Sequence, residues 1–90
     1  MVVHIIFSGR VQGVGFRYAI YQKAIQHDVK GWVRNNDDGT VEMEAEGTKK
    51  QLKTFVRSLD KWPNPFIKVT DKKITYLDEE KGYKDFSIVY

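Results

Sequence analysis

Residues 2–20 read VVHIIFSGRVQGVGFRYAI, in which an apolar run leads through three glycines into a helical pattern. Apolar residues fall on both faces of 2–8, which predicts a strand in the middle of a sheet. The glycines within 9–15 predict a loop. From Phe16 onward, apolar residues recur at the spacing of one buried helical face, and we expect this helix to end near Asp28. The chain therefore opens as a strand, a glycine-rich loop and a helix.

A hairpin is predicted next. Residues 29–34 form its first strand, and the turn at 35–39, NNDDG, consists of residue types that tolerate a positive φ. In the second strand, 40–46, Val, Met and Ala alternate with glutamates. One face of this strand is therefore apolar and the other acidic.

The second half of the chain repeats the order of helix and strand. Thr48 and Gln51 have the spacing of a capping box, in which each side chain satisfies a backbone N–H group at a helix start. The segment WPNP at 62–65 cannot continue that helix, because proline lacks an N–H group and restricts its neighbour. Two further strands are predicted at about 66–77 and 83–90.

The order β-α-β-β-α-β-β is typical of an α+β fold, the ferredoxin-like split βαβ sandwich with an additional C-terminal strand. Two helices cover one face of an antiparallel sheet, and the third strand lies between the first and second, which run parallel. The loop 9–17 follows the first strand and Asn35 ends the second, so we expect them to meet at one edge. The length, 90 residues, and the absence of linker-like composition predict a single domain, 1–90.

Composition excludes several classes of protein. The chain has no cysteine, so neither disulfides nor a thiolate metal site can support it, and no thiol nucleophile exists. No stretch approaches the roughly 20 apolar residues of a membrane span. The net charge of +3 mildly favours anionic partners, but 12 acidic residues are interspersed with 15 basic ones. We expect a cytoplasmic monomer that binds neither nucleic acid nor a membrane.

The loop 9–17, GRVQGVGFR, has the properties of an anion site. Glycines allow successive N–H groups to point inward, and the first N–H groups of a helix have no internal partner and carry partial positive charge. Arg17 falls in the first helical turn, where a cation opposes the helix dipole unless an anion lies between them. Its guanidinium can bind two phosphate oxygens at once. A tight turn with a solvated arginine is the alternative interpretation.

These motifs resemble those of a known family. Residues 9–17 look like the acylphosphatase signature loop, and GWVRN at 31–35 with DGTV at 38–41 looks like the second signature of that family. The similarity extends over essentially the whole chain, including the capped helix at Thr48. One departure is Asn36, where many members have threonine, and this change can alter the support of the site.

The resemblance implies a metal-free, cofactor-free enzyme that hydrolyses the carboxyl–phosphate bond of acyl phosphates. By that similarity Arg17 binds the substrate phosphate and Asn35 positions the attacking water. Inorganic phosphate, the product, should also inhibit. The same similarity assigns the substrate phosphate to the backbone amides of Gln12, Gly13, Val14, Gly15 and Phe16.

Two binding modules compete with the enzyme. An RNA-binding domain of this fold stacks bases on the open sheet face, but Glu42, Glu44 and Glu46 would line that face and repel a phosphate backbone. A non-catalytic regulatory domain that binds a small anion in the same loop stays open, because a fold does not determine a function. Retention of both Arg17 and Asn35 favours the enzyme, since simple anion binding needs no amide to orient water.

The remaining polar candidates are weaker. His4 and His27 are isolated in the sequence and do not make a zinc site, so structural or solvated roles are expected. Arg10 and Arg34 can add positive potential near a phosphate, and a solvated or ion-paired role explains them equally well.

Overall fold

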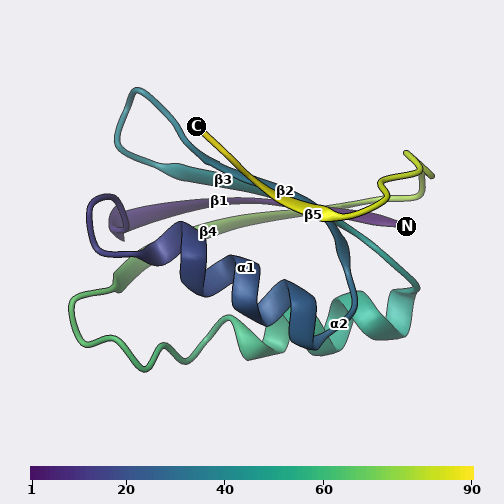
Figure 1. The fold of residues 1–90 in the computed structure, drawn as a ribbon, viewed down its shortest axis with the longest axis horizontal. Helices are drawn as coiled ribbons and strands as arrows, with labels where there is room; N and C mark the ends of the chain where they lie inside the picture. Colours follow the sequence, from purple (N-terminus) through teal and green to yellow (C-terminus); the bar gives the residue numbers. More distant parts are fainter.

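The structure, a computed structural model, describes residues 1–90 as a five-stranded sheet with two helices against one face (Figure 1). The strand order across the sheet is β4-β1-β3-β2-β5. The elements are β1 (Val2–Arg10), α1 (Phe16–Gln26), β2 (Lys30–Asn35), β3 (Val41–Glu46), α2 (Lys49–Ser58), β4 (Lys68–Leu77) and β5 (Phe86–Val89). The predicted fold class and the order of its elements are confirmed.

The central strand β3 determines where the two motifs meet. It pairs antiparallel with both β1 and β2, so β1 and β2 run parallel to each other, as predicted. Val41 at the start of β3 pairs with Phe7 on one side and with Asn35 on the other. The glycine-rich loop that follows β1 is therefore brought to the end of β2.

The strand β1 extends further than the hydrophobic pattern predicted. It continues through Arg10 because β4 pairs with it as far as Lys68, with a register shift between Ser8 and Gly9. Gly9 has φ +120°, and a Cβ atom there would lie 2.2 Å from the carbonyl oxygen of Lys68. Only glycine fits this close approach of two strands. The loop itself therefore begins at Val11, and Gly9 belongs to the strand.

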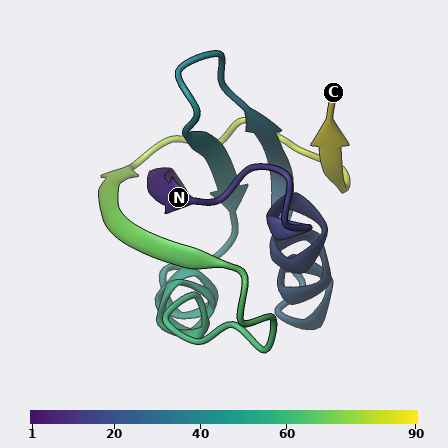
Figure 2. The ribbon, with the colours of Figure 1, turned by 90° about the vertical axis from the view of Figure 1, so that its left-hand side faces the viewer.

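The last strand makes the sheet mixed. β5 pairs parallel with β2, with Val33 opposite Ile88, whereas the other pairs are antiparallel. Segment 78–85 connects β4 at one edge to β5 at the other, and in Figure 2 it is seen crossing the sheet. Its residue Tyr83 donates a hydrogen bond to Glu44 on the sheet face opposite the helices. Glu44 is consequently buried rather than open to solvent.

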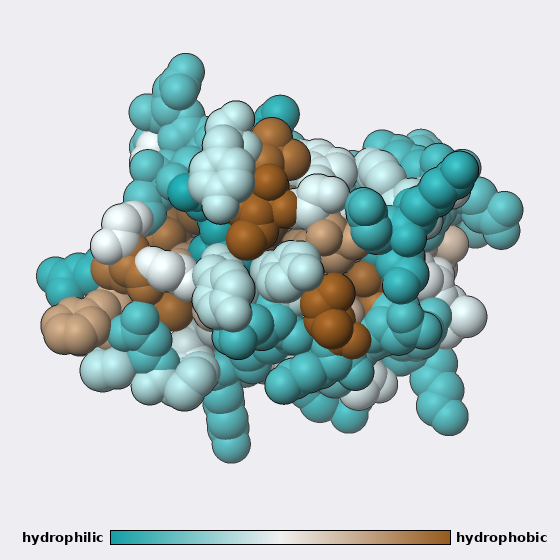
Figure 3. All heavy atoms as spheres, viewed as in Figure 1, coloured by the Kyte–Doolittle hydropathy of each residue, from teal (hydrophilic) through white to brown (hydrophobic).

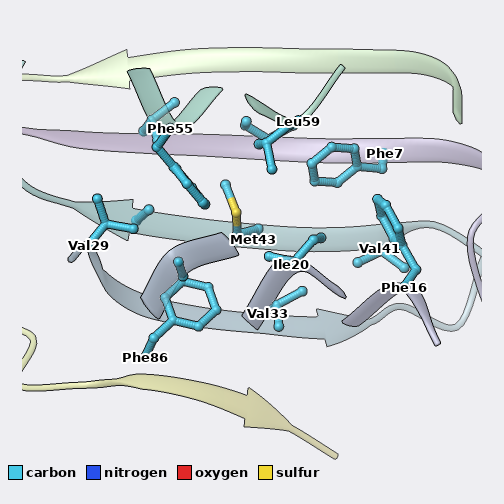
Figure 4. Close-up of a cluster of buried hydrophobic side chains, with 14 of the residues drawn as sticks. Phe7, Phe16, Ile20, Val29, Val33, Val41, Met43, Phe55, Leu59 and Phe86 are labelled. Atoms are coloured by element: carbon cyan, nitrogen blue, oxygen red, sulfur yellow. The ribbon is translucent and has the colours of Figure 1, made fainter. Parts of the chain in front are cut away.

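The core lies between the sheet and the helices and reaches the glycine-rich loop. Figure 4 shows Met43 of β3 at its centre, among side chains from both helices. Phe7, three residues before the end of β1, and Phe16 at the start of α1 are fully buried and pack edge to face, with ring centroids 5.0 Å apart. Burial of such side chains stabilises the fold by about 1.5–3 kcal/mol each. This contact holds the two ends of the loop together.

The helices begin where their sequences indicate. The predicted capping box of α2 is present: Thr48 Oγ1 accepts from the Gln51 amide at 3.1 Å, and Gln51 Oε1 accepts from the Thr48 amide at 2.8 Å. By contrast, α1 begins after Gly15 with no side-chain cap and no acidic residue in its first turn. Its N-terminal N–H groups are thus left for another acceptor. Neither helix has the length and apolar character needed to cross a membrane.

Candidate active site

A small pocket opens at the end of the sheet where the loop, β2 and β5 meet, the end that Figure 2 shows toward the viewer. Its volume of about 180 Å³ suits a small ligand rather than a drug-sized one. The pocket is lined by Val11, Gly13, Gly15, Phe16, Arg17, Tyr18, Asn35, Ile88 and Tyr90. It therefore joins the two motifs that the sequence singled out.

The backbone of the loop presents free donors. Gly13 and Gly15 have φ of +75° and +76°, and nothing lies within 4 Å of a Cβ placed at either. The glycines are thus needed for their conformation and not for space. None of the backbone N–H groups of 12–18 donates a hydrogen bond within the protein. A concave run of free N–H groups that ends in a helix N-terminus is suited to an anion.

Arg17 supplies an unbalanced positive charge beside these donors. Its Nη1 donates to the carbonyl oxygen of Val89 at 3.1 Å, and its Cζ lies 4.8 Å from the centroid of the Tyr90 ring. No carboxylate forms an ion pair with it. A guanidinium has five N–H donors, so several remain for a ligand.

Asn35 contributes an acceptor that has no partner. Its position is determined by the last β2–β3 pair, in which it lies opposite Val41. The Oδ1 atom is buried and accepts no hydrogen bond from the protein. An unsatisfied buried polar atom costs about 1–3 kcal/mol, so the fold alone does not explain the placement of Oδ1.

Gln12 and Val14 do not line the pocket with their side chains. Gln12 Nε2 donates to the carbonyl oxygens of Asn36 and Thr40, at 2.8 and 2.9 Å, and so ties the loop to the β2–β3 turn. The Val14 side chain packs against the core. Neither residue lines the pocket. The expectation that their backbone N–H groups bind the substrate phosphate therefore stays a prediction.

The turn beneath Asn35 accommodates the unusual Asn36. Its Nδ2 donates to Thr40 Oγ1 at 2.9 Å, and its N–H group donates to the Thr40 carbonyl at 2.8 Å. Thr40 in turn donates from both its hydroxyl and its amide to Asp38, which lowers the pKa of that carboxyl. Asn36 therefore supports the turn that carries Asn35.

The weaker candidates lie elsewhere. His4 and Arg34 both contact Glu42, at 2.6 and 3.0 Å, on the sheet face opposite the helices. The ion-paired role expected for Arg34 is thus present, and His4 has a structural partner. Arg10 is exposed, pairs with no carboxylate and does not line the pocket. No three side chains of the metal-binding types gather anywhere in the chain.

Sequence reasoning missed several parts of the site. The pocket is also lined by four residues that were not predicted, Val11, Tyr18, Ile88 and Tyr90. Asn64, fifty residues from the loop, donates from Nδ2 to the Val14 carbonyl at 2.9 Å. The prolines on both sides of Asn64 indicated only that the helix cannot continue there, and no local pattern reveals the distant partner of Asn64.

Comparisons with known proteins show to which family this chain belongs. The sequence profile of the acylphosphatases matches residues 3–88. The chain belongs to the acylphosphatase family. The acylphosphatase of Bacillus licheniformis is 51% identical over 86 residues, which cover 96% of this chain and 94% of that protein. The crystal structure of the Bacillus subtilis acylphosphatase matches with a TM-score of 0.92 and 46% identity over the whole of both chains.

The acylphosphatase fold also occurs inside a longer protein. Full-length HypF, crystallised in a phosphate- and nucleotide-bound form, matches 99% of this chain with a TM-score of 0.89 and 35% identity, over 12% of its own length. The acylphosphatase domain can therefore exist as one module of a larger chain.

Proposed function

We propose that Arg17, Asn35 and the loop 12–16 carry out the acylphosphatase reaction, the hydrolysis of the carboxyl–phosphate bond of an acyl phosphate to a carboxylate and inorganic phosphate. The phosphoryl oxygens accept hydrogen bonds from the free loop amides and from the Arg17 guanidinium. Asn35 Oδ1 accepts a hydrogen bond from the attacking water. The loop thus serves as the phosphate-binding loop.

One observation carries this assignment. Free backbone donors, an arginine without a carboxylate and Asn35, whose buried Oδ1 has no partner, line the same small pocket. A tetrahedral dianion satisfies the first two, and a water bound next to it satisfies the third. A site built only to hold an anion has no use for the acceptor, which supports the enzyme over a non-catalytic anion-binding domain.

The chemistry requires little else. Water forms a bond to phosphorus while the bond from phosphorus to the acyl oxygen breaks, and the carboxylate leaves with the electron pair. Carboxylates have pKa values near 4, so this leaving group needs no general acid. Phosphoryl transfer through a loose transition state depends on positioning and on stabilisation of charge. Asparagine cannot take the proton of the water, which passes to a phosphate oxygen.

No metal or organic cofactor enters this proposal. The donor set of the pocket is an amide oxygen, a guanidinium and backbone N–H groups, which suits an anion and offers a cation one neutral ligand. Segment 78–85 crosses the sheet face opposite the helices and bonds to Glu44 and Glu46 there, which argues against bases stacking on that face. We further propose a single-domain monomer that acts in the cytoplasm. The lack of cysteine supports that location. On the face that Figure 3 shows, the most hydrophobic residues form small separate patches, which is in line with a monomer.

The test is turnover of benzoyl phosphate by purified protein after exhaustive EDTA treatment. We expect full activity and competitive inhibition by inorganic phosphate. Activity that is lost to EDTA and restored by a divalent ion would contradict the metal-free mechanism. Phosphate binding without any turnover would instead favour the non-catalytic anion-binding domain.

A further inference from the structure

Segment 61–67, between α2 and β4, lies against the glycine-rich loop without lining the pocket. Trp62 packs on Phe16 with ring centroids 4.7 Å apart, which anchors the segment at the start of α1. From there Asn64 Nδ2 donates to the carbonyl oxygen of Val14 at 2.9 Å. This is the one side-chain hydrogen bond that reaches the middle of the loop, since Gln12 bonds outward from its start.

The loop needs such a contact because packing does not fix its glycines. Both Gly13 and Gly15 have open space where a side chain would be, so no packed side chain restrains them at that point. Glycine also reaches more of φ, ψ space than any other residue. Val14 packs against the core and the Gly15 carbonyl accepts from the Ala19 amide at 3.1 Å, but the carbonyl of the peptide between them is held by Asn64, which restrains the orientation of that peptide plane.

That orientation determines where an N–H group points. All peptide bonds in the chain are trans, so the Val14 carbonyl and the Gly15 N–H group point in opposite directions across one plane. The Val14 carbonyl points toward segment 61–67, where Asn64 binds it. The Gly15 N–H group on the other side of the same peptide plane therefore points away from that segment. Gly15 lines the pocket, and no residue of 61–67 does.

We propose that Asn64 is a positioning residue of the acylphosphatase reaction: it holds the Val14 carbonyl so that the Gly15 N–H group faces the bound phosphoryl group. This inference rests on the function proposed above. Asn64 is itself held in place by two hydrogen bonds. Its side-chain Oδ1 accepts from the Phe66 amide at 2.9 Å, and its backbone carbonyl oxygen accepts from the Ile67 amide at 3.2 Å. Both ends of its side-chain amide are thus used, one for its own turn and one for the loop.

Two substitutions separate the hydrogen bond of Asn64 to the loop from its hydrogen bond within its own turn. Asn64→Ala removes both hydrogen bonds. Asn64→Asp keeps an oxygen for the Phe66 amide and so preserves the turn, but it has no N–H group for the Val14 carbonyl. The control is Thr48→Ala, which weakens the fold at the cap of α2, at the opposite end of the molecule from the loop in Figure 1.

The measurements are the dissociation constant of inorganic phosphate, kcat and KM for benzoyl phosphate, and the NMR shift of the Gly15 amide during phosphate titration. Loss of one donor to a developing oxyanion costs roughly 10²–10³-fold in kcat, and a donor that is misaligned rather than deleted should cost on the order of tenfold. We expect both Asn64 variants to lose about tenfold in kcat/KM, to bind phosphate more weakly, and to show a reduced Gly15 shift. Thr48→Ala should unfold at a lower temperature with unchanged affinity and turnover.

Normal activity and phosphate affinity in Asn64→Asp would overturn the proposal, because the turn alone would then explain Asn64. Normal values in folded Asn64→Ala would also overturn it. If wild-type protein binds phosphate but does not turn over benzoyl phosphate, the proposed reaction fails, while the phosphate titration and the Gly15 shift still decide the role of Asn64.

Discussion

Arg17 is placed where no carboxylate of the fold balances its charge. It lies in the first turn of α1, where the helix dipole opposes a cation, and no carboxylate compensates it. Its contacts are the Val89 carbonyl and the Tyr90 ring, both on the C-terminal segment. A bound phosphoryl group between the guanidinium and the helix start makes this placement favourable.

The shape of the Arg17 side chain can be tested at constant charge. Arg17→Lys keeps the charge but replaces a planar fork by a point charge, so two phosphoryl oxygens lose their fixed spacing relative to the water. A misplacement of about 1 Å can cost on the order of 10²-fold in rate, and we expect a folded, nearly inactive protein that binds phosphate more weakly. Arg10→Lys, on an exposed arginine outside the pocket, is the matched control and should retain activity. Near-normal kcat in Arg17→Lys would refute bidentate binding.

Asn35 is expected to act on the water rather than on the phosphate. Asn35→Ala should therefore lower kcat by roughly 10²-fold or more while the phosphate dissociation constant changes little. Steady-state kinetics with benzoyl phosphate and a phosphate titration measure the two quantities. Asp37→Asn, in the exposed turn that follows Asn35, should leave both unchanged. Equal losses in kcat and in phosphate affinity would show that Asn35 binds the phosphoryl group instead.

At the scale of the elements, the three central strands are linked by a polar group on the face opposite the helices. Glu42 of β3 accepts from His4 of β1 and from Arg34 of β2. These strands carry the loop and Asn35 at their ends, so the group holds together the scaffold of the site. The hydrogen bond from His4, with help from Arg34, keeps the pKa of Glu42 below its ordinary value of 4.5.

This depressed pKa predicts a pH dependence of stability. In the pH range between the folded and the unfolded pKa of Glu42, the unfolded chain binds more protons, so stability rises with pH and falls as acid is added below about 4.5. Glu42→Gln should show a lower free energy of unfolding near neutral pH and a smaller decline in acid. Urea denaturation at several pH values measures both. Parallel pH profiles for the two proteins would mean that Glu42 contributes nothing to the acid sensitivity.

At the scale of the whole molecule, a ligand that binds only the folded pocket must stabilise the entire chain. The elements of the site come from the loop, β2 and β5, whose association requires the complete sheet. Unfolding therefore releases the ligand, and phosphate binding and folding are linked.

Phosphate should accordingly raise the melting temperature. At 100 times its dissociation constant a ligand adds about 2.7 kcal/mol to the free energy of unfolding, and 1 kcal/mol corresponds to roughly 4–8 °C in a domain of this size. We expect a rise on the order of 10 °C by calorimetry, absent in Arg17→Ala. Chloride at equal ionic strength is the control, and an equal rise with chloride would contradict specific binding.

Much of the molecule was predictable from the sequence because its signals are local. The alternation in β3, the capping box at Thr48 and the glycines before Phe16 each act within a few residues, and they determined the order of the elements. The family motifs identified the acylphosphatase. The roles of Arg17 and Asn35 remain predictions, although both residues line the same pocket as expected.

Only the tertiary structure decided the pairings between segments that are distant in the sequence. No local pattern shows that β5 runs parallel beside β2, that β4 extends β1 to Arg10, or that segment 78–85 buries Glu44. The same holds for Asn64 and Val14, which are fifty residues apart. Periodicity and capping report the preferences of a short stretch of chain, whereas these contacts form only after the core has brought separate stretches together.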